Sequence, residues 1–240
     1  MRALFRIALC LVLAHAAAAA ASEIGVTPVV VHLDKAHDRA TLSVVNSGAE
    51  PVIMQAEVIE WKRSNGAEED APSADMVINP SVFTVQPGQA QLVRVGLRRA
   101  APAQREGTYR IVLREVPAAP RAGELRISGQ VQVLMALRVP IYVAPHAVVR
   151  ELRWQARREP DGSVTATLHN EGNVHARVGR MQLRSSEGVL ASQAFPAVVF
   201  PGETQSFRWH GLGQIVAQPL TLEAATDHGA HSVPVALAGR

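Results

Sequence analysis

The stretch Val82-Phe-Thr-Val-Gln-Pro-Gly-Gln-Ala-Gln-Leu-Val-Arg-Val-Gly-Leu97 holds two runs of alternating apolar residues, one on each side of Pro87-Gly88. Alternation with a period of two is typical of a strand that buries one face. Pro-Gly is a turn signal, because proline pre-sets one backbone angle and glycine accepts conformations that other residues avoid. The stretch therefore predicts two short strands joined by a tight turn.

The same pattern extends through most of the chain. Further strands are expected at 41–45, 52–61, 109–116, 130–139, 148–153, 164–168, 176–184, 205–209, 220–224 and 232–237. Turn signals separate them at intervals of about 8–15 residues, and no segment beyond residue 21 has the 3.6-residue period of a helix. With a linker near 144–146, the pattern predicts an all-β protein of two consecutive immunoglobulin-like β-sandwich domains, at 22–145 and 146–240.

The N-terminus has the features of a secretory signal peptide. Arg2 and Arg6 precede an apolar run too short to span a membrane and an alanine-rich tract, with cleavage expected after Ala21. Removal of residues 1–21 leaves 22 basic and 21 acidic residues, which lowers the formal charge from +3 to +1 and gives no basic patch for nucleic acid. Cys10, the only cysteine, is lost with the signal. The mature chain is therefore expected to be exported, soluble and free of disulfides, with no segment inserted in a membrane.

No enzyme motif is present in the sequence. It lacks G-x-S-x-G, H-E-x-x-H, the P-loop and G-x-G-x-x-G. The candidates for a metal site are three histidine pairs, namely His32 with His37, His169 with His175, and His228 with His231. None has the alternating or i, i+4 spacing that places two imidazoles on one face of a regular element. We interpret them as surface or turn histidines, and expect no catalytic residue, metal or cofactor.

The longest expected strand, at 130–139, follows a Pro/Gly-rich segment at 117–123 that is expected to be an exposed, mobile loop. A period of two places one apolar row on a single face of this strand, formed by Val131, Val133, Met135, Leu137 and Val139. Such a row usually faces the core of its own domain. Residues after about Leu137 are the ones expected to do so here.

Several segments together resemble the PapD-like periplasmic pilus chaperones. Residues 80–95 resemble the first-domain signature of that family, and Tyr109-Arg-Ile-Val-Leu-Arg-Glu-Val-Pro117 is similar to its sixth strand and the start of its long loop. In the second half, Asn170-Glu-Gly-Asn-Val-His175 and Val199-Phe-Pro-Gly202 are similar to turns of the family's second domain. The resemblance follows the family's order over nearly the whole chain, behind a signal peptide.

The resemblance implies a non-enzymatic periplasmic chaperone whose two domains form an L-shaped arrangement. Its partners would be pilus or fimbrial subunits, which are immunoglobulin-like folds lacking their last strand, and an outer-membrane usher that receives them. The chaperone would lend the subunit its own seventh strand, here at 130–139, by donor-strand complementation; chaperone–pilin pairs are an established instance of such strand addition. Carried over by position, the residues that fill the subunit's groove would be Val131, Val133, Met135 and Leu137.

Two basic residues that hold the subunit's terminal carboxylate in this family are absent. Val30 and Pro140 occupy their positions. An arginine suits a carboxylate because it can donate two parallel hydrogen bonds, so Arg138, Arg114 and Arg110 are candidate anchors. That these arginines are simply solvated strand residues is the alternative interpretation.

The family's interdomain salt bridge also differs. Glu115 and Asp227 occupy its acidic positions, whereas Ala144 stands in place of its arginine. These departures indicate a divergent branch, of the archaic or spore-coat-U type. Two other functions stay open from the sequence alone: a secreted structural or adhesive protein that shares the fold without chaperone activity, and a metal-dependent hydrolase built on the histidines.

Overall fold

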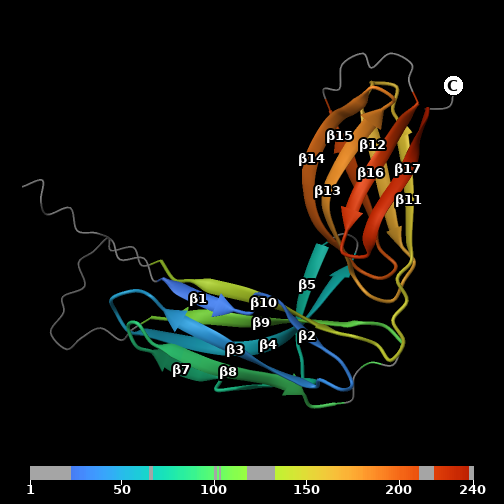
Figure 1. Ribbon diagram of the computed structural model, residues 1–240. Helices are drawn as coiled ribbons and strands as arrows, with labels where there is room; N and C mark the ends of the chain where they lie inside the picture. Colours follow the sequence, from blue (N-terminus) through green and yellow to red (C-terminus); the bar gives the residue numbers. More distant parts are fainter. Residues whose placement is uncertain are drawn as a thin grey trace, which may run out of the picture.

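A computed structural model describes residues 23–64, 67–99, 102, 104–117, 133–210 and 219–237. The predicted signal peptide and Val131 lie outside the described residues. Figure 1 shows two all-β domains in an L-shaped arrangement, with β1 to β10 in the first and β11 to β17 in the second. Both the all-β class and the two immunoglobulin-like domains expected from the sequence are confirmed. No helix in the described part of the chain is long and apolar enough to cross a bilayer.

The first domain packs two sheets against each other. One has the order β1-β3-β8-β6, and the other has the order β2-β10-β9-β4-β5, with β7 also paired to β4. The strands are β1 (Ile24–Thr27), β2 (Val31–Leu33), β3 (Arg39–Asn46), β4 (Val52–Ser64), β5 (Ala67–Pro72), β6 (Met76–Asn79), β7 (Val82–Val85), β8 (Ala90–Leu97), β9 (Gly107–Val116) and β10 (Ala136–Val143).

The second domain is built from one sheet that curves round its core, with the order β14-β13-β16-β17-β11-β12-β15 (Figure 1). Its strands are β11 (Leu152–Arg158), β12 (Val164–Asn170), β13 (Ala176–Ser185), β14 (Gly188–Val199), β15 (Thr204–Trp209), β16 (Leu220–Thr226) and β17 (Gly229–Leu237). Alternate residues of each strand point inward. The largest fully buried side chains of this core are Leu168, Met181, Leu183 and Leu222.

Residues 82–97 form β7 and β8 as predicted, joined through Pro87-Gly88. The two strands lie in different sheets, since β7 pairs with β4 while β8 pairs with β3 and β6. The turn therefore carries the chain across the sandwich, and apolar residues of both strands, such as Val85 and Val93, meet in one core.

Two buried asparagines close equivalent corners of the two domains. Asn46, at the end of β3, donates from Nδ2 to the carbonyls of Glu50 and Val85, over 2.7 and 3.0 Å. Asn170, at the end of β12, makes the equivalent bonds to the carbonyls of Val174 and Val199, each over 2.9 Å. Each side chain thereby satisfies backbone groups that no strand can reach.

Glycine is required at three points of these corners. The N–H groups of Gly88 and Gly202 donate to the backbone oxygens of Asn46 and Asn170, both over 2.8 Å, with positive φ angles of 69° and 76°. Those angles lie in the left-handed region that side chains disfavour. A Cβ on Gly172 would lie 2.4 Å from a backbone oxygen, so this position excludes any larger residue.

Two strand predictions are corrected by the structure. The strand expected at 130–139 is β10 (Ala136–Val143); within the described residues it starts later and runs four residues further, because β2 pairs with its last three residues. The strand expected at 148–153 is β11 (Leu152–Arg158). Strands β5, β6 and β14 were not predicted, and the stretch 26–33, which the resemblance aligns with the family's first strand, is divided between β1 and β2.

Candidate functional site

One edge of β10 is open along most of its length. On its other side β10 pairs with β9 throughout, whereas β2 covers only Ile141–Val143. The Glu115 N–H donates to the Met135 carbonyl over 2.9 Å, and backbone groups alternate in direction along a strand. The backbone N–H and C=O groups of Leu137 therefore also face β9. The backbone groups of Ala136 and Arg138 face the open edge, where no described strand pairs with them.

The apolar row of β10 passes from the core of the domain to its surface. Val139 and Ile141 are buried in the first-domain core, and Leu137 packs against that core while only partly buried. Met135 is half-buried, and Val133 is 86% exposed. The row thus continues beyond the domain's own core, onto apolar side chains that directly precede β10 and its open edge.

A second feature is a cleft of about 610 Å³ at the junction of the domains. Its lining consists of Trp61, Arg63, Glu68, Arg110, Pro196, Ala197, Val198, Glu203, Thr204 and Gln205. The aromatic residues at this junction are Trp61 and Tyr142 of the first domain and Phe200 of the second, and Val30 packs against them. Val30, which stands where the family has an arginine, therefore belongs to an apolar contact between the domains.

Arg110 is the candidate anchor that the structure places in this cleft. Its guanidinium donates two bonds to the Glu68 carboxylate, of 2.8 and 2.9 Å, and stacks 3.7 Å above the Trp61 ring. Only 11% of the Arg110 side chain is exposed. The guanidinium holds the pKa of Glu68 below its usual range. Pro140 lies directly across from Arg110 in the β9–β10 ladder.

Arg63 is a second arginine of the cleft, and it was not among the predicted site residues. It donates to the Val198 carbonyl over 2.9 Å and to the Glu203 carboxylate over 3.0 Å, and its guanidinium lies 4.9 Å from the Phe200 ring centroid. Its place after Trp61, at the end of the long strand β4, brings it to the second domain. Arg63 thereby ties the two domains together.

The other two predicted arginines differ in position. Arg138 lies on the same face of the sheet as Arg110 and pairs with Asp70 over 3.5 Å. Arg114 pairs with Glu57, about 13 Å further along β9 at the usual rise of a strand. Arg110 and Arg138 therefore share the acidic side chains of β5, whereas Arg114 pairs with Glu57 of β4.

The interdomain contact uses a different acid from the one expected. Glu115 lies beside Met135, far from the second domain, so its predicted interdomain role is wrong. Glu106 has that role: its carboxylate accepts bonds from the backbone N–H and from Nδ1 of His175, each over 2.8 Å. The His175 ring also stacks on Tyr142, with centroids 3.6 Å apart. The interdomain contact of this chain is therefore a Glu106–His175 pair.

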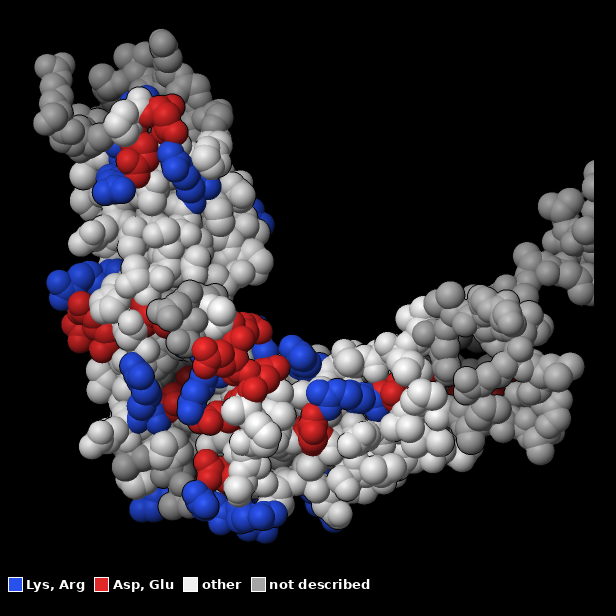
Figure 2. Space-filling model, turned by 180° about the vertical axis from the view of Figure 1, so that it is seen from behind, with Lys and Arg blue, Asp and Glu red and all other residues white. Residues whose placement is uncertain are grey.

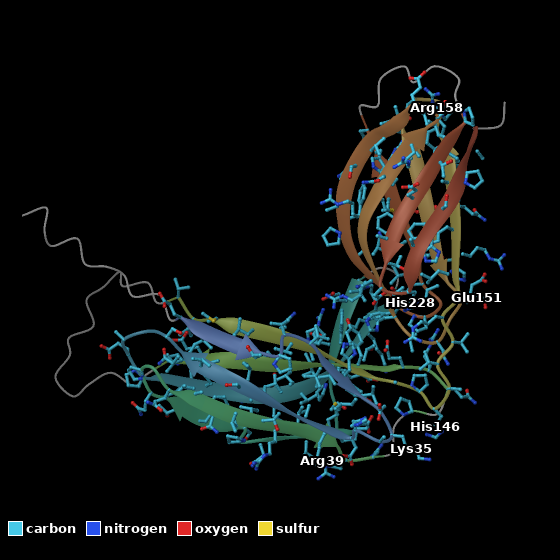
Figure 3. All side chains as sticks on the ribbon, viewed as in Figure 1. Lys35, Arg39, His146, Glu151, Arg158 and His228 are labelled. Carbon is cyan, nitrogen blue, oxygen red and sulfur yellow. The ribbon has the colours of Figure 1, made fainter. Side chains whose placement is uncertain are left out.

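Two histidines are not the surface residues predicted. The side chains of His175 and His228 are each only 7% exposed, and Figure 3 shows His228 at the end of the second domain nearest the first. Burial lowers the pKa of His228 and also that of His32, which stacks on Tyr142. Within the described ranges, no three His, Cys, Asp or Glu side chains converge as a metal site would require.

Comparison with known proteins identifies the family. Residues 23–149 match the family model described as pili and flagellar-assembly chaperone, PapD N-terminal domain. The chain belongs to this family, whose members are non-enzymatic pilus chaperones. No curated protein sequence matches the chain at a significant level.

Solved structures share the two-domain fold at low sequence identity. A chain of the CsuC–CsuE chaperone–tip adhesion subunit complex from the archaic Csu pili of Acinetobacter baumannii is 14% identical, with 91% of this chain and 100% of that chain covered and a TM-score of 0.63. The CupB2 chaperone of Pseudomonas aeruginosa is 18% identical (87% and 98% covered, TM-score 0.57), and the SafA pilin–SafB chaperone complex of Salmonella enterica is 16% identical (90% and 97%, TM-score 0.58).

Proposed function

We propose that this chain is a periplasmic chaperone that completes the fold of pilus or fimbrial subunits by donor-strand complementation and delivers them to an outer-membrane usher. The observation that carries the proposal is the form of β10: an open edge whose apolar row continues past the domain's core to Met135 and Val133. Membership of the pilus chaperone family supports the same function.

A subunit lacking its last strand would pair with the open edge of β10. Its backbone would bond to Ala136 and Arg138, the residues whose backbone groups point away from β9. Met135 and Val133, together with Val131 outside the described residues, would fill the groove that the missing strand leaves. Burying each such side chain contributes about 1.5–3 kcal/mol. Leu137 would contribute less, because the chaperone's own core already covers part of it.

The subunit's terminal carboxylate would bind Arg110. This guanidinium is fixed on the Trp61 ring, already bonds a carboxylate, and lies across from Pro140, where the family's lysine is missing. Arg138 lies close enough to assist, since both arginines contact Asp70. Arg114 is the weakest of the three candidates because its guanidinium pairs with Glu57 and not with the acids beside Arg110.

The cellular setting follows from the same proposal. A signal peptide at 1–21 would export the chain to the periplasm, leaving domains at 22–145 and 146–240. The usher would receive the chaperone–subunit complex, and the strand of another subunit would displace β10. No ATP would be consumed, since the subunit's own folding can drive this exchange.

The test is a pull-down of the tagged protein from its native periplasm, beside the Met135→Asp variant. Wild type is expected to recover a small β-rich subunit, and the variant to lose it while keeping a native circular dichroism spectrum and melting temperature. Recovery of the same partner by both would place the binding strand elsewhere. Recovery of nothing by wild type, under conditions where fibres assemble, would favour a structural or adhesive protein of the same fold.

A further inference from the structure

The short edge strand β5 brings two acidic side chains to the arginines of the cleft. Glu68 and Asp70 are two residues apart and therefore point to the same side of β5. Glu68 bonds Arg110 through both carboxylate oxygens, and Asp70 lies within 3.4 Å of Arg110 and 3.5 Å of Arg138. Figure 2 shows acidic and basic side chains gathered at the bend between the domains.

Arg110 is fixed more firmly in the structure than Glu68, its carboxylate partner. Arg110 comes from β9, an inner strand, and is almost fully buried over Trp61. Glu68 comes from β5, which pairs only with β4, exposes all six of its residues, and leaves the Glu68 side chain 45% exposed. The acid can therefore leave by a small movement, whereas the arginine cannot.

We propose that Glu68, with Asp70, occupies the carboxylate-binding position of Arg110 in the free protein and is displaced when a subunit's terminal carboxylate binds. This inference rests on the proposed function. A buried guanidinium without a partner is costly, so an internal carboxylate keeps the free cleft neutral. Replacing the Glu68 carboxylate on Arg110 by the carboxylate of a ligand gains little binding free energy by itself. Only a ligand that also pairs with β10 would displace Glu68, so β5 excludes free carboxylates and unrelated chain ends.

The exclusion of small carboxylates can be measured directly. Sodium acetate is titrated into the ¹⁵N-labelled mature protein at constant ionic strength, with chloride as the balancing salt, and the Arg110 Nε–H and Trp61 Nε1–H signals are followed by NMR. The Glu68→Gln variant, and the same variant with Asp70→Asn, should bind acetate at least about tenfold more tightly than wild type, because a charged hydrogen-bond competitor is removed. Glu69→Gln makes the same charge change on β5 and should behave as wild type.

An equal response of the Arg110 signal in wild type, Glu68→Gln and Glu69→Gln would overturn the inference, as would no response in any of them. Glu68→Gln keeps the shape and one acceptor of the side chain, so a folded variant is available if the double variant unfolds. Subunit capture is scored separately in the same proteins. If the subunit is captured but wild type and Glu68→Gln bind acetate equally, the proposed role of β5 is wrong and the chaperone function stands. If Glu68→Gln binds acetate more tightly but no subunit is captured, the role of β5 stands and the chaperone function is wrong.

Discussion

At the scale of single residues, the fold depends on a few polar groups that satisfy the backbone where strands end. Asn46 and Asn170 are completely buried, and each bridges a loop carbonyl and a carbonyl at the end of a distant strand. Their position after an apolar strand and before a glycine predicted a turn. The long-range partners, Val85 and Val199, could not be predicted from the sequence because they depend on how the strands are brought together.

Asn170→Ala should lower the free energy of unfolding by about 2–4 kcal/mol, because it removes the side-chain donor of two buried carbonyls. Urea unfolding followed by circular dichroism measures the loss. Gln193→Ala, which removes an exposed amide from β14, is the matched control and should change stability by less than about 0.5 kcal/mol. Equal effects of both substitutions would show that the buried bonds of Asn170 contribute little.

At the scale of elements, most strands with a clear apolar alternation were predicted, whereas β5, which is held by charge, was not. β5 reads Ala-Glu-Glu-Asp-Ala-Pro and has no apolar face, because its side chains meet arginines of β4, β9 and β10. Asn65-Gly66 between Arg63 and Glu68 was the available signal, since it favours a two-residue hairpin flanked by opposite charges. The extent of β10 depends on β2, which pairs with it across about 100 residues of chain.

Aspartate substitutions along the apolar row of β10 should separate binding from folding. Met135→Asp should change the melting temperature little, because the side chain lies beyond the core, whereas Ile141→Asp should abolish cooperative folding by placing a charge among fully buried residues. Leu137→Asp should fall between them. Differential scanning calorimetry of the three variants measures their melting temperatures and so gives their order of stability. A Met135→Asp variant as unstable as Ile141→Asp would mean that the whole row is internal core.

At the scale of the whole molecule, the two domains are joined by side chains that the sequence could not bring together. Glu106 and His175 are 69 residues apart, and their bond is covered by the stack of Tyr142 on His175. The position of Glu106 before β9 carries no pattern that distinguishes it from other surface acids. The His32 ring, whose centroid lies 6.4 Å from that of His175, also stacks on Tyr142, so a histidine whose pKa is lowered by burial lies at this joint.

Acidification should weaken this joint. Burial lowers the pKa of His32, His175 and Arg177 lower it further, and Glu106 and Asp227 oppose them. The folded protein therefore favours neutral His32, and the stability gained from it is complete above the ordinary pKa of about 6.5 and is lost as the pH falls from that value through the lower folded pKa. The melting temperature should fall slightly, by about 1 °C or less, between pH 7.5 and 5.5, because His32 is exposed and solvent screens the effect.

The His32→Gln variant should show a smaller pH dependence than wild type, because it removes one of the titrating groups. His146→Gln is the matched control, since His146 lies exposed in the linker between the domains (Figure 3) and its substitution should leave the wild-type pH profile unchanged. Identical profiles for wild type and His32→Gln would exclude His32 as a contributor to the pH dependence.

The central claim is that a subunit adds its strand to the open edge of β10, and amide hydrogen exchange of this strand tests it most directly. In the free protein the amides of Ala136 and Arg138, which face the open edge, should exchange much faster than those of Leu137 and Val139, which face β9. In the complex with the captured subunit, Ala136 and Arg138 should become as protected as their neighbours. A stable complex in which these two amides still exchange at the free rate would contradict donor-strand complementation.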